Sequence, residues 1–213
     1  MDEDLNIINQ RTRIENTKKF FFDNKKKIIF VFFSLIIILF SYFIYQELKI
    51  ASKNNLAEQF NQLTMNRIDP NEKDKIDKML EIIKKKDQTY STLSLYYLLD
   101  FNLISDKEKI NKLFDIIIEI QNEKEIKFLN IYKKALYNSD KSSENELLNI
   151  ISPIIKSKSV WKPHALLLMA EFYFSKNELN KSKEFFLEIT DLENINNDIK
   201  LEASKRLNRD FSE

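Results

Sequence analysis

The 213-residue chain contains no glycine and no cysteine, has one histidine, and carries a formal net charge of +1. A glycine-rich phosphate loop, a disulfide or reactive thiol, and a metal site built from several histidines are therefore excluded. From residue 46 onward 27 basic residues are balanced by 28 acidic ones, so the composition lacks the concentrated basic face that nucleic-acid binding requires.

The first predicted element is a transmembrane helix over residues 28–45. These 18 residues, IIFVFFSLIIILFSYFIY, carry no charge and include only two serines. At about 1.5 Å per residue they span about 27 Å, close to the thickness of a bilayer core. A buried core helix would be expected to have a polar face, and a cleaved signal peptide should be followed by a small-residue cleavage site. The stretch after the span offers only Ala51 and Ser52, so we expect an uncleaved signal anchor.

The charges that flank the span predict its direction. The 20 residues before it contain seven basic residues, whereas the 20 after it contain two. The positive-inside rule then places residues 1–27 in the cytoplasm as an N-terminal arm and residues 46–213 in the periplasm, with the chain in the inner membrane. Three phenylalanines, residues 20–22, either lie in the inner interface or extend the apolar span. The predicted membrane-anchor residues are Lys25, Lys26 and Lys27 at the inner end and Tyr42 and Tyr45 at the outer end.

The rest of the chain is predicted to be all-α, because apolar residues recur at helical spacing and no glycine turn joins alternating runs. The stretch 48–66 continues the membrane helix outward, and Asp69, Pro70 and Glu72 predict the start of the next helix. A capping box at Ser143 and Glu146 predicts another start. Further helices are expected over residues 90–102, 106–121, 124–137, 143–156, 163–175, 178–192 and 195–207.

Asparagine is expected to replace glycine at the left-handed position that follows many helices. It is abundant in this chain, at positions such as Asn102, Asn138, Asn177 and Asn208.

Alternate helices begin at regular intervals. First helices are predicted to begin near residues 89, 124 and 162, and second helices near 106, 143 and 178. Both series advance by about 35 residues, a period typical of solenoids in which helix pairs bury each other's apolar faces. The clearest unit covers residues 165–189, where Ala170 and Ser182 occupy the small positions of a tetratricopeptide repeat. The predicted fold is therefore a single N-terminal transmembrane helix followed by a TPR-like helical-hairpin solenoid.

If these hairpins coil as tetratricopeptide repeats do, their first helices line a concave groove. The mixture of apolar and polar positions there suits an extended segment or a partner helix. The residues predicted to face this partner groove are Thr92, Leu95, Leu99 and Asn102 in an earlier unit and His164, Leu167, Glu171 and Phe174 in the last unit.

Two residues beside Pro163 allow two interpretations each. Trp161 either is a binding hot spot or packs against Met169 or the preceding repeat. His164 either acts as a pH switch or is an ordinary half-buried histidine.

The chain offers no arrangement typical of an active site. Glu144 and Glu146 stand two positions apart and therefore do not face each other on a helix. The single histidine lacks the neighbouring acid and nucleophile of a triad. We predict that the protein is not an enzyme, has no catalytic, cofactor-binding or metal-binding residues, requires no cofactor and takes no small-molecule substrate.

The whole chain resembles the ancillary-subunit family of the SecYEG translocon (YfgM type), in particular its alphaproteobacterial branch. Three stretches carry the resemblance. They are the acidic start at residues 2–5 followed by a basic arm and a single anchor, the apolar positions Leu147, Leu148 and 151–155 before Trp161, and the run 161–170 with its hairpin.

This resemblance implies a membrane-anchored adaptor at the translocon that links secreted or inserting chains to periplasmic chaperones by protein–protein binding. The expected partners are translocon subunits, a periplasmic chaperone, emerging chains and the inner membrane, without nucleic acid. The alternative is a cell-envelope assembly or division scaffold that is independent of the translocon, because helical repeats bind many partners.

Overall fold

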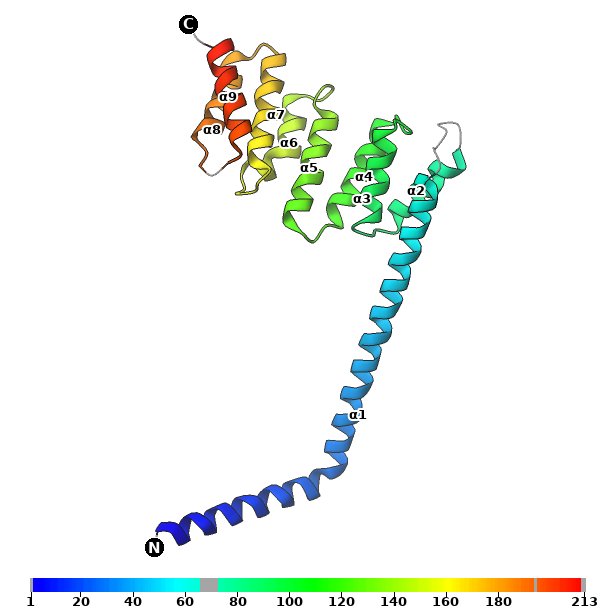
Figure 1. Ribbon diagram of the computed structural model, residues 1–213, viewed down its shortest axis with the longest axis vertical. Coiled ribbons are helices and arrows are strands. Elements are labelled where there is room, and N and C mark those ends of the chain that lie inside the picture. Colours follow the sequence, from blue (N-terminus) through cyan, green and yellow to red (C-terminus); the bar gives the residue numbers. More distant parts are fainter. Residues whose placement is uncertain (1, 66–72, 194, 212–213) are drawn as a thin grey trace. The chain divides into compact units, whose positions relative to one another are not determined.

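The computed structural model describes residues 2–65, 73–193 and 195–211, and within these ranges the chain forms nine α-helices and no strand (Figure 1). The all-α prediction is therefore confirmed. The chain divides into two compact units, Met1–Asn55 and Leu56–Glu213. The helices are α1 (Asp2–Met65), α2 (Lys73–Lys84), α3 (Tyr90–Asp100), α4 (Lys107–Glu119), α5 (Lys124–Asn138), α6 (Glu144–Ile155), α7 (Lys162–Ser175), α8 (Leu179–Asp191) and α9 (Asn197–Asp210).

Helix α1 contains the predicted span. In the described part of the chain it is the one helix that is long and apolar enough to cross a membrane or to act as a signal anchor. None of residues 28–45 is buried, and the large apolar side chains of this segment are mostly more than half exposed. Ser34 and Ser41 donate hydrogen bonds of 2.8 Å to backbone carbonyls of the preceding turn, so both hydroxyls are satisfied without another helix. An apolar solvent is the environment that suits this surface.

The predicted helix starts agree with the structure to within one residue from α3 to α8, whereas α9 begins two residues later than predicted. Asp106 caps α4 by accepting a 3.0 Å hydrogen bond from the N–H of Lys109. Ser143 and Glu146 form the predicted capping box before α6. Because such caps satisfy backbone donors that a helix leaves unpaired, they fix where these helices begin. The start predicted at residues 69–72 lies outside the described residues.

Two helices end on asparagines in the left-handed conformation that glycine usually adopts. Asn102 has a φ of 52° and Asn177 a φ of 61°. After α7 the N–H of Asn177 donates to the carbonyl of Phe174 at 3.0 Å, and that of Glu178 donates to Tyr173 at 2.9 Å. This bond pair is the Schellman motif, so asparagine replaces glycine as expected at these two helix ends. The other two asparagines singled out, Asn138 and Asn208, lie inside α5 and α9.

The second unit consists of helical hairpins that stack on one another. One apolar cluster joins the end of α1 to α2, α3 and α4, a second joins α5, α6 and α7, and a third joins α7, α8 and α9. Ile118 packs against both the first and the second cluster, and Ile155 and Phe185 pack against both the second and the third. The clusters are therefore continuous through shared side chains, as expected when each hairpin covers its neighbour.

Close helix crossings coincide with small residues. The Ser182 hydroxyl donates a 2.8 Å hydrogen bond to the carbonyl of Ala170, and both residues are fully buried. The small residues Ala170 and Ser182 therefore lie where α7 and α8 cross closely. A similar contact joins α3 to α2, where the Ser91 hydroxyl donates to the carbonyl of Ile82 at 3.1 Å.

A buried polar seam joins α5 to the preceding hairpin. Asn130 is fully buried, accepts a hydrogen bond from the Tyr96 hydroxyl and donates to the carbonyl of Ile117 at 3.3 Å. Asn111 and Asn138 exchange side-chain hydrogen bonds of 2.7 and 3.1 Å. A buried amide without a partner costs about 1–3 kcal/mol, so sliding α5 along α4 is disfavoured at both positions.

Replacing Asn177 tests the left-handed cap. Asn177→Gly should leave stability unchanged or raise it by a few tenths of a kcal/mol, whereas Asn177→Val should lower it by about 1–2 kcal/mol, because a branched Cβ clashes in this conformation. Thermal unfolding of the detergent-solubilised chain, followed by circular dichroism, measures both changes. Asn149→Gly, at an exposed position inside α6, should be destabilising. A loss of stability in Asn177→Gly as large as in Asn149→Gly would contradict the argument.

Candidate functional site

The predicted groove residues of α3 differ in their accessibility. Thr92 and Leu95 are buried, Leu99 is half-buried, and Asn102 is exposed just beyond the end of the helix. Leu95 exposes no surface at all, so it offers nothing to a partner. On the same helix Leu93 and Asp100 are exposed, and Tyr96 and Tyr97 are half-buried like Leu99.

The rotation of α3 is set by polar contacts with its neighbours. Ser91 is drawn against α2 by its hydrogen bond to Ile82. Thr92 donates to the carbonyl of Gln88 at 2.9 Å and accepts from the Gln121 side chain at 3.0 Å. Because these two residues face inward, the accessible positions in the first half of α3 include Leu93 and Tyr96. Each lies one position after a residue predicted to face the groove, Thr92 or Leu95.

On α7 the predicted stripe is partly covered by α9. Arg206 lies with its Nη2 atom 2.7 Å from the Glu171 carboxylate and its guanidinium 4.5 Å from the ring centroid of Phe174. Leu167 packs against the apolar cluster that includes α9. The Arg206 side chain is only 11% exposed, so this contact is largely shielded from solvent. The Glu171 side chain nevertheless remains 45% exposed, and His164 lines an open pocket.

Three rings meet where α5 faces the start of α7. The rings of Tyr132 and Trp161 are stacked with centroids 5.9 Å apart, and the His164 ring lies 5.1 Å from Trp161 and 5.9 Å from Tyr132. Trp161 therefore packs against the preceding hairpin, which was one of the two roles predicted for it. Burial raises the pKa of Tyr132, so its phenol stays protonated at neutral pH.

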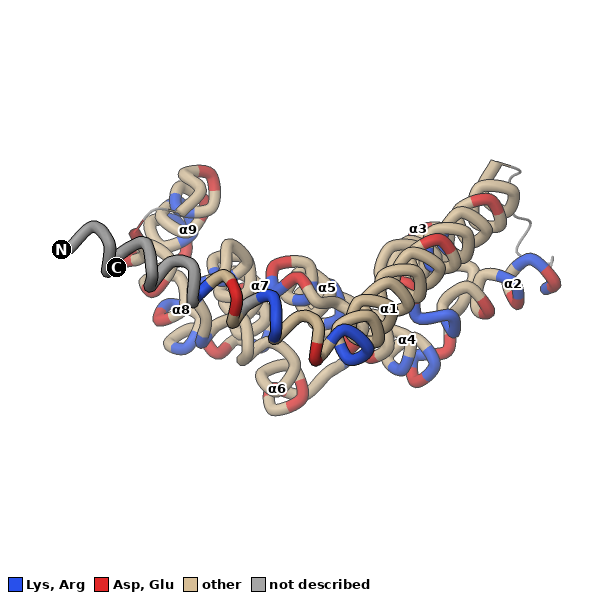
Figure 2. The backbone as a smooth tube through the Cα atoms, turned by 90° about the horizontal axis from the view of Figure 1, so that it is seen from below, with Lys and Arg blue, Asp and Glu red and all other residues tan. Residues whose placement is uncertain are grey.

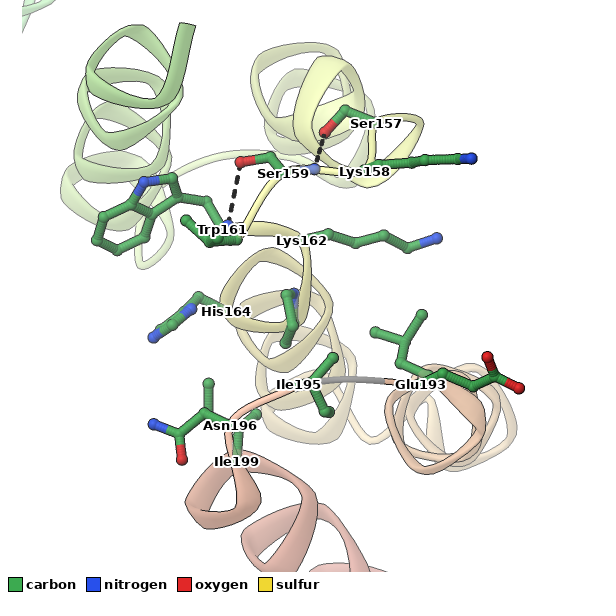
Figure 3. A pocket seen from close by; sticks show the side chains of 13 residues that line it. Ser157, Lys158, Ser159, Trp161, Lys162, His164, Glu193, Ile195, Asn196 and Ile199 are labelled. Atoms are coloured by element: carbon green, nitrogen blue, oxygen red, sulfur yellow. Dashed lines mark hydrogen bonds between the residues drawn. The ribbon is translucent and has the colours of Figure 1, made fainter.

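Hydrogen bonds in the connection between α6 and α7 hold Trp161 in place. The Ser159 hydroxyl accepts from the N–H of Trp161 at 3.1 Å and donates to the Glu125 carboxylate of α5. Ser157 in turn accepts from the N–H of Ser159 at 3.0 Å (Figure 3). Pro163 suits the first turn of α7 because its nitrogen carries no hydrogen to satisfy.

A pocket of about 740 Å³ opens beside these rings. It is lined by the connection before α7, the first turn of α7 and the connection between α8 and α9. Figure 3 shows Trp161 and His164 projecting to one side of the start of α7, whereas Lys162 projects to the other. Val160, also in the lining, is 68% exposed. The volume and mostly apolar lining are in the range of sites that take a side chain or small ligand.

His164 brings a polar group to this pocket. Its Nδ1 atom is buried and makes no hydrogen bond with any described residue. Buried polar atoms in proteins usually have a partner, so the unpaired Nδ1 atom sets His164 apart from the other described side chains of the pocket lining.

The accessible surface continues from α7 across α5 to α3. The Lys133 ammonium lies 3.5 Å from the ring centroid of Tyr96, and Leu136 beside it is 50% exposed. A second, smaller hollow of about 250 Å³ is formed there between α3, α4 and α5. Burial, followed by the nearby charge of Asp100, raises the pKa of Tyr96, which keeps its hydroxyl a donor to Asn130. We name the following residues the first-helix face: Tyr96, Leu99, Tyr132, Lys133, Leu136, Trp161 and His164.

The carboxylates considered as a pair serve separate structural contacts. Glu146 accepts from the N–H of Ser143, and this bond lowers the pKa of Glu146. Glu144 accepts from the Tyr173 hydroxyl at 2.7 Å and pairs with Lys181 at 2.9 Å, and these contacts lower the pKa of Glu144. Burial and then Glu144 raise the pKa of Tyr173 to about 12.

Charged residues elsewhere are interspersed. Figure 2 shows basic and acidic segments next to one another along α4, α8 and α9. Within the part of the chain that the structure describes, no three His, Asp or Glu side chains converge to hold a metal ion.

The predicted anchor residues all lie on the surface of α1. Lys25, Lys26 and Lys27 are exposed before the span, and Tyr42 and Tyr45 are 55% and 64% exposed near its end. The Tyr42 hydroxyl accepts a 2.8 Å hydrogen bond from the Gln46 side chain, which places two polar groups together at the C-terminal end of the apolar stretch.

The chain matches no protein-family model, no curated protein and no solved structure.

Arg206→Ala tests how firmly α9 covers α7. Removing the guanidinium deletes its contacts with Glu171 and Phe174, so amide exchange across residues 197–210 should accelerate, with a loss of about 1 kcal/mol. Hydrogen–deuterium exchange with mass spectrometry measures this. Arg209→Ala is the matched control, because that side chain is 66% exposed and pairs only with the neighbouring Asp210. Equal exchange in the two variants would contradict the role of Arg206 in holding α9 against α7.

Glu144 predicts a specific pH dependence of stability. Because its pKa is lowered in the folded state, its contacts stabilise the fold fully above the unfolded pKa of about 4.3, and this stabilisation is lost as pH falls through the folded pKa. Glu144→Gln should lower the Tm near neutral pH and flatten its fall in acid. Thermal unfolding at a series of pH values checks this. Glu108→Gln is the control, since Glu108 and Lys112 are 3.9 Å apart and highly exposed. Curves for wild type and Glu144→Gln that remain parallel would refute the prediction.

Proposed function

We propose that this protein is a membrane-anchored scaffold that binds other proteins through the first-helix face. The observation that carries the proposal is the aromatic cluster of Tyr132, Trp161 and His164, accessible beside a pocket of about 740 Å³. Tryptophan and tyrosine are enriched at binding hot spots, where a rigid ring fills or borders a pocket.

The shape of the surface favours a peptide segment as the bound element. Accessible side chains from α3, α5 and α7 lie along the row of first helices, and the two hollows lie at different points of that row. A partner helix, or an extended chain, that places one apolar side chain in each hollow would use both. Lys133, which lines the smaller hollow, favours a segment with an acidic residue close to that hollow.

We propose that this scaffold is a TPR-like domain that acts at the SecYEG translocon. The resemblance to its ancillary subunit supports this setting, and the flanking charges support a periplasmic position for residues 46–213. There the scaffold links secreted or inserting chains to periplasmic chaperones. Anchoring raises the local concentration of the domain near membrane-bound partners, so weak contacts suffice for binding.

Crosslinking followed by affinity purification of the tagged full-length chain tests the proposal. Translocon subunits and a periplasmic chaperone should be recovered with the wild type. The double variant Leu136→Glu and Val160→Glu should reduce their recovery about tenfold, because it places charge on the apolar binding surface. Both side chains are at least half exposed, so the fold is expected to be retained.

Leu187→Glu is the matched control, because Leu187 is 44% exposed on α8, away from the first helices. It should leave recovery unchanged. Recovery of division or envelope-assembly proteins in place of the translocon would move the function to the alternative scaffold. Equal recovery with the double variant and the control would refute binding through the first-helix face.

A further inference from the structure

A second candidate surface lies on α1 just before the span. Ile14, Lys18, Phe21, Phe22 and Lys25 are spaced at intervals of four, three, one and three residues. At about 100° per residue these five side chains fall within a third of the helix circumference. The result is one stripe in which large apolar and basic side chains alternate, and we name these five residues the aromatic–basic stripe.

The apolar members of this stripe are uncovered. Ile14 and Phe21 are each 55% exposed, and Phe22 is 75% exposed. Arg13, Ile14, Lys18, Phe21 and Phe22 line a shallow hollow of about 440 Å³ on the helix surface. Adjacent exposed apolar side chains of this size are typical of a surface that contacts a membrane or a partner.

The charge of the segment selects the kind of surface that it fits. Residues 13–27 contain six basic and two acidic residues, a net charge of +4. Asp23 lies on the side of the helix opposite the stripe and Glu15 lies at its edge. The Lys25 ammonium is 5.9 Å from the ring centroid of Phe22, so the aromatic ring and the positive charge lie side by side on the helix surface. A basic segment next to a membrane span is attracted to anionic headgroups, and its phenylalanines suit the membrane interface.

We propose that residues 13–27 bind the anionic lipid headgroups of the leaflet from which the span enters the membrane. The inference rests on the proposed membrane anchoring and not on the translocon. The span begins at residue 28, directly after three lysines, so the aromatic–basic stripe is tethered next to the bilayer surface. Figure 1 shows α1 changing direction between its deep-blue N-terminal stretch and the stretch that follows.

A lipid surface fits better than a protein partner because the basic charge surrounds the helix. Lys19, Lys26 and Lys27 lie outside the stripe, where one docked protein would leave them unused. A planar layer of negative headgroups attracts all of them, and their long side chains reach the headgroups while the rings enter the interface. The phenylalanines then act as an inner aromatic anchor, one of the two roles expected from the sequence.

The test uses the full-length chain in nanodiscs, with a single tryptophan as reporter. Trp161 is the one native tryptophan, so a Phe21→Trp substitution in a Trp161→Phe background reports on the stripe alone. Quenching by acyl-chain-brominated lipid should be at least about twofold stronger in discs with about 30% phosphatidylglycerol than in phosphatidylcholine discs. The difference should shrink when salt is raised from about 50 to about 500 mM.

Two double variants distinguish the effect of the basic residues in the aromatic–basic stripe from the effect of the total charge of the chain. Lys18→Gln with Lys25→Gln should reduce the quenching in anionic discs toward the level in neutral discs, whereas Lys109→Gln with Lys112→Gln in α4 should not change it. Equal quenching in both lipids would overturn the proposal, as would an in-cell crosslink from position 21 to a protein in place of lipid. A chain that fails to enter either disc overturns the membrane anchor itself, and this outcome is distinct from loss of the lipid preference.

Discussion

A lone hairpin of this chain buries one flank of each helix and leaves the other flank apolar and uncovered. The next hairpin covers it, and residues such as Ile118, Ile155 and Phe185 pack into two clusters at once. The helices are consequently held as a row, because moving one hairpin would open cavities on both sides of it. The outward faces of α3, α5 and α7 remain accessible as a consequence of this stacking, and the first-helix face lies on them.

The absence of glycine means that side chains must fix the angles and turns of the row. Asn102 and Asn177 take the left-handed positions at two helix ends, where a short polar side chain tolerates the strained backbone. Buried asparagines then set how α5 lies against α4, since Asn130 and Asn138 lose hydrogen bonds if the helix slides or turns. The position of Lys133 over Tyr96, and hence the smaller hollow, follows from that register.

Helix positions were predictable because they depend on local chemistry. Capping residues such as Asp106 and Ser143, together with the 3.6-residue apolar period, act within a turn of the helix that they define. The accessible face of each helix was not fully predictable, because it depends on contacts between distant residues. Thr92 turns inward to meet Gln121, and Glu171 pairs with Arg206, which is 35 residues away. No spacing rule within α3 or α7 contains that information.

The covering of α7 by α9 limits what the last hairpin offers to a partner. Arg206 stacks on the Phe174 ring and pairs with Glu171, so a bound segment would compete with Arg206 for these side chains but not at the first turn of α7. The connection between α8 and α9 borders that turn and closes the far side of the pocket beside Trp161 and His164. A short contact surface of this kind supports modest affinity. Tethering to the membrane increases the occupancy of a binding surface most when its affinity is modest, because the local concentration of the partner then determines the occupancy.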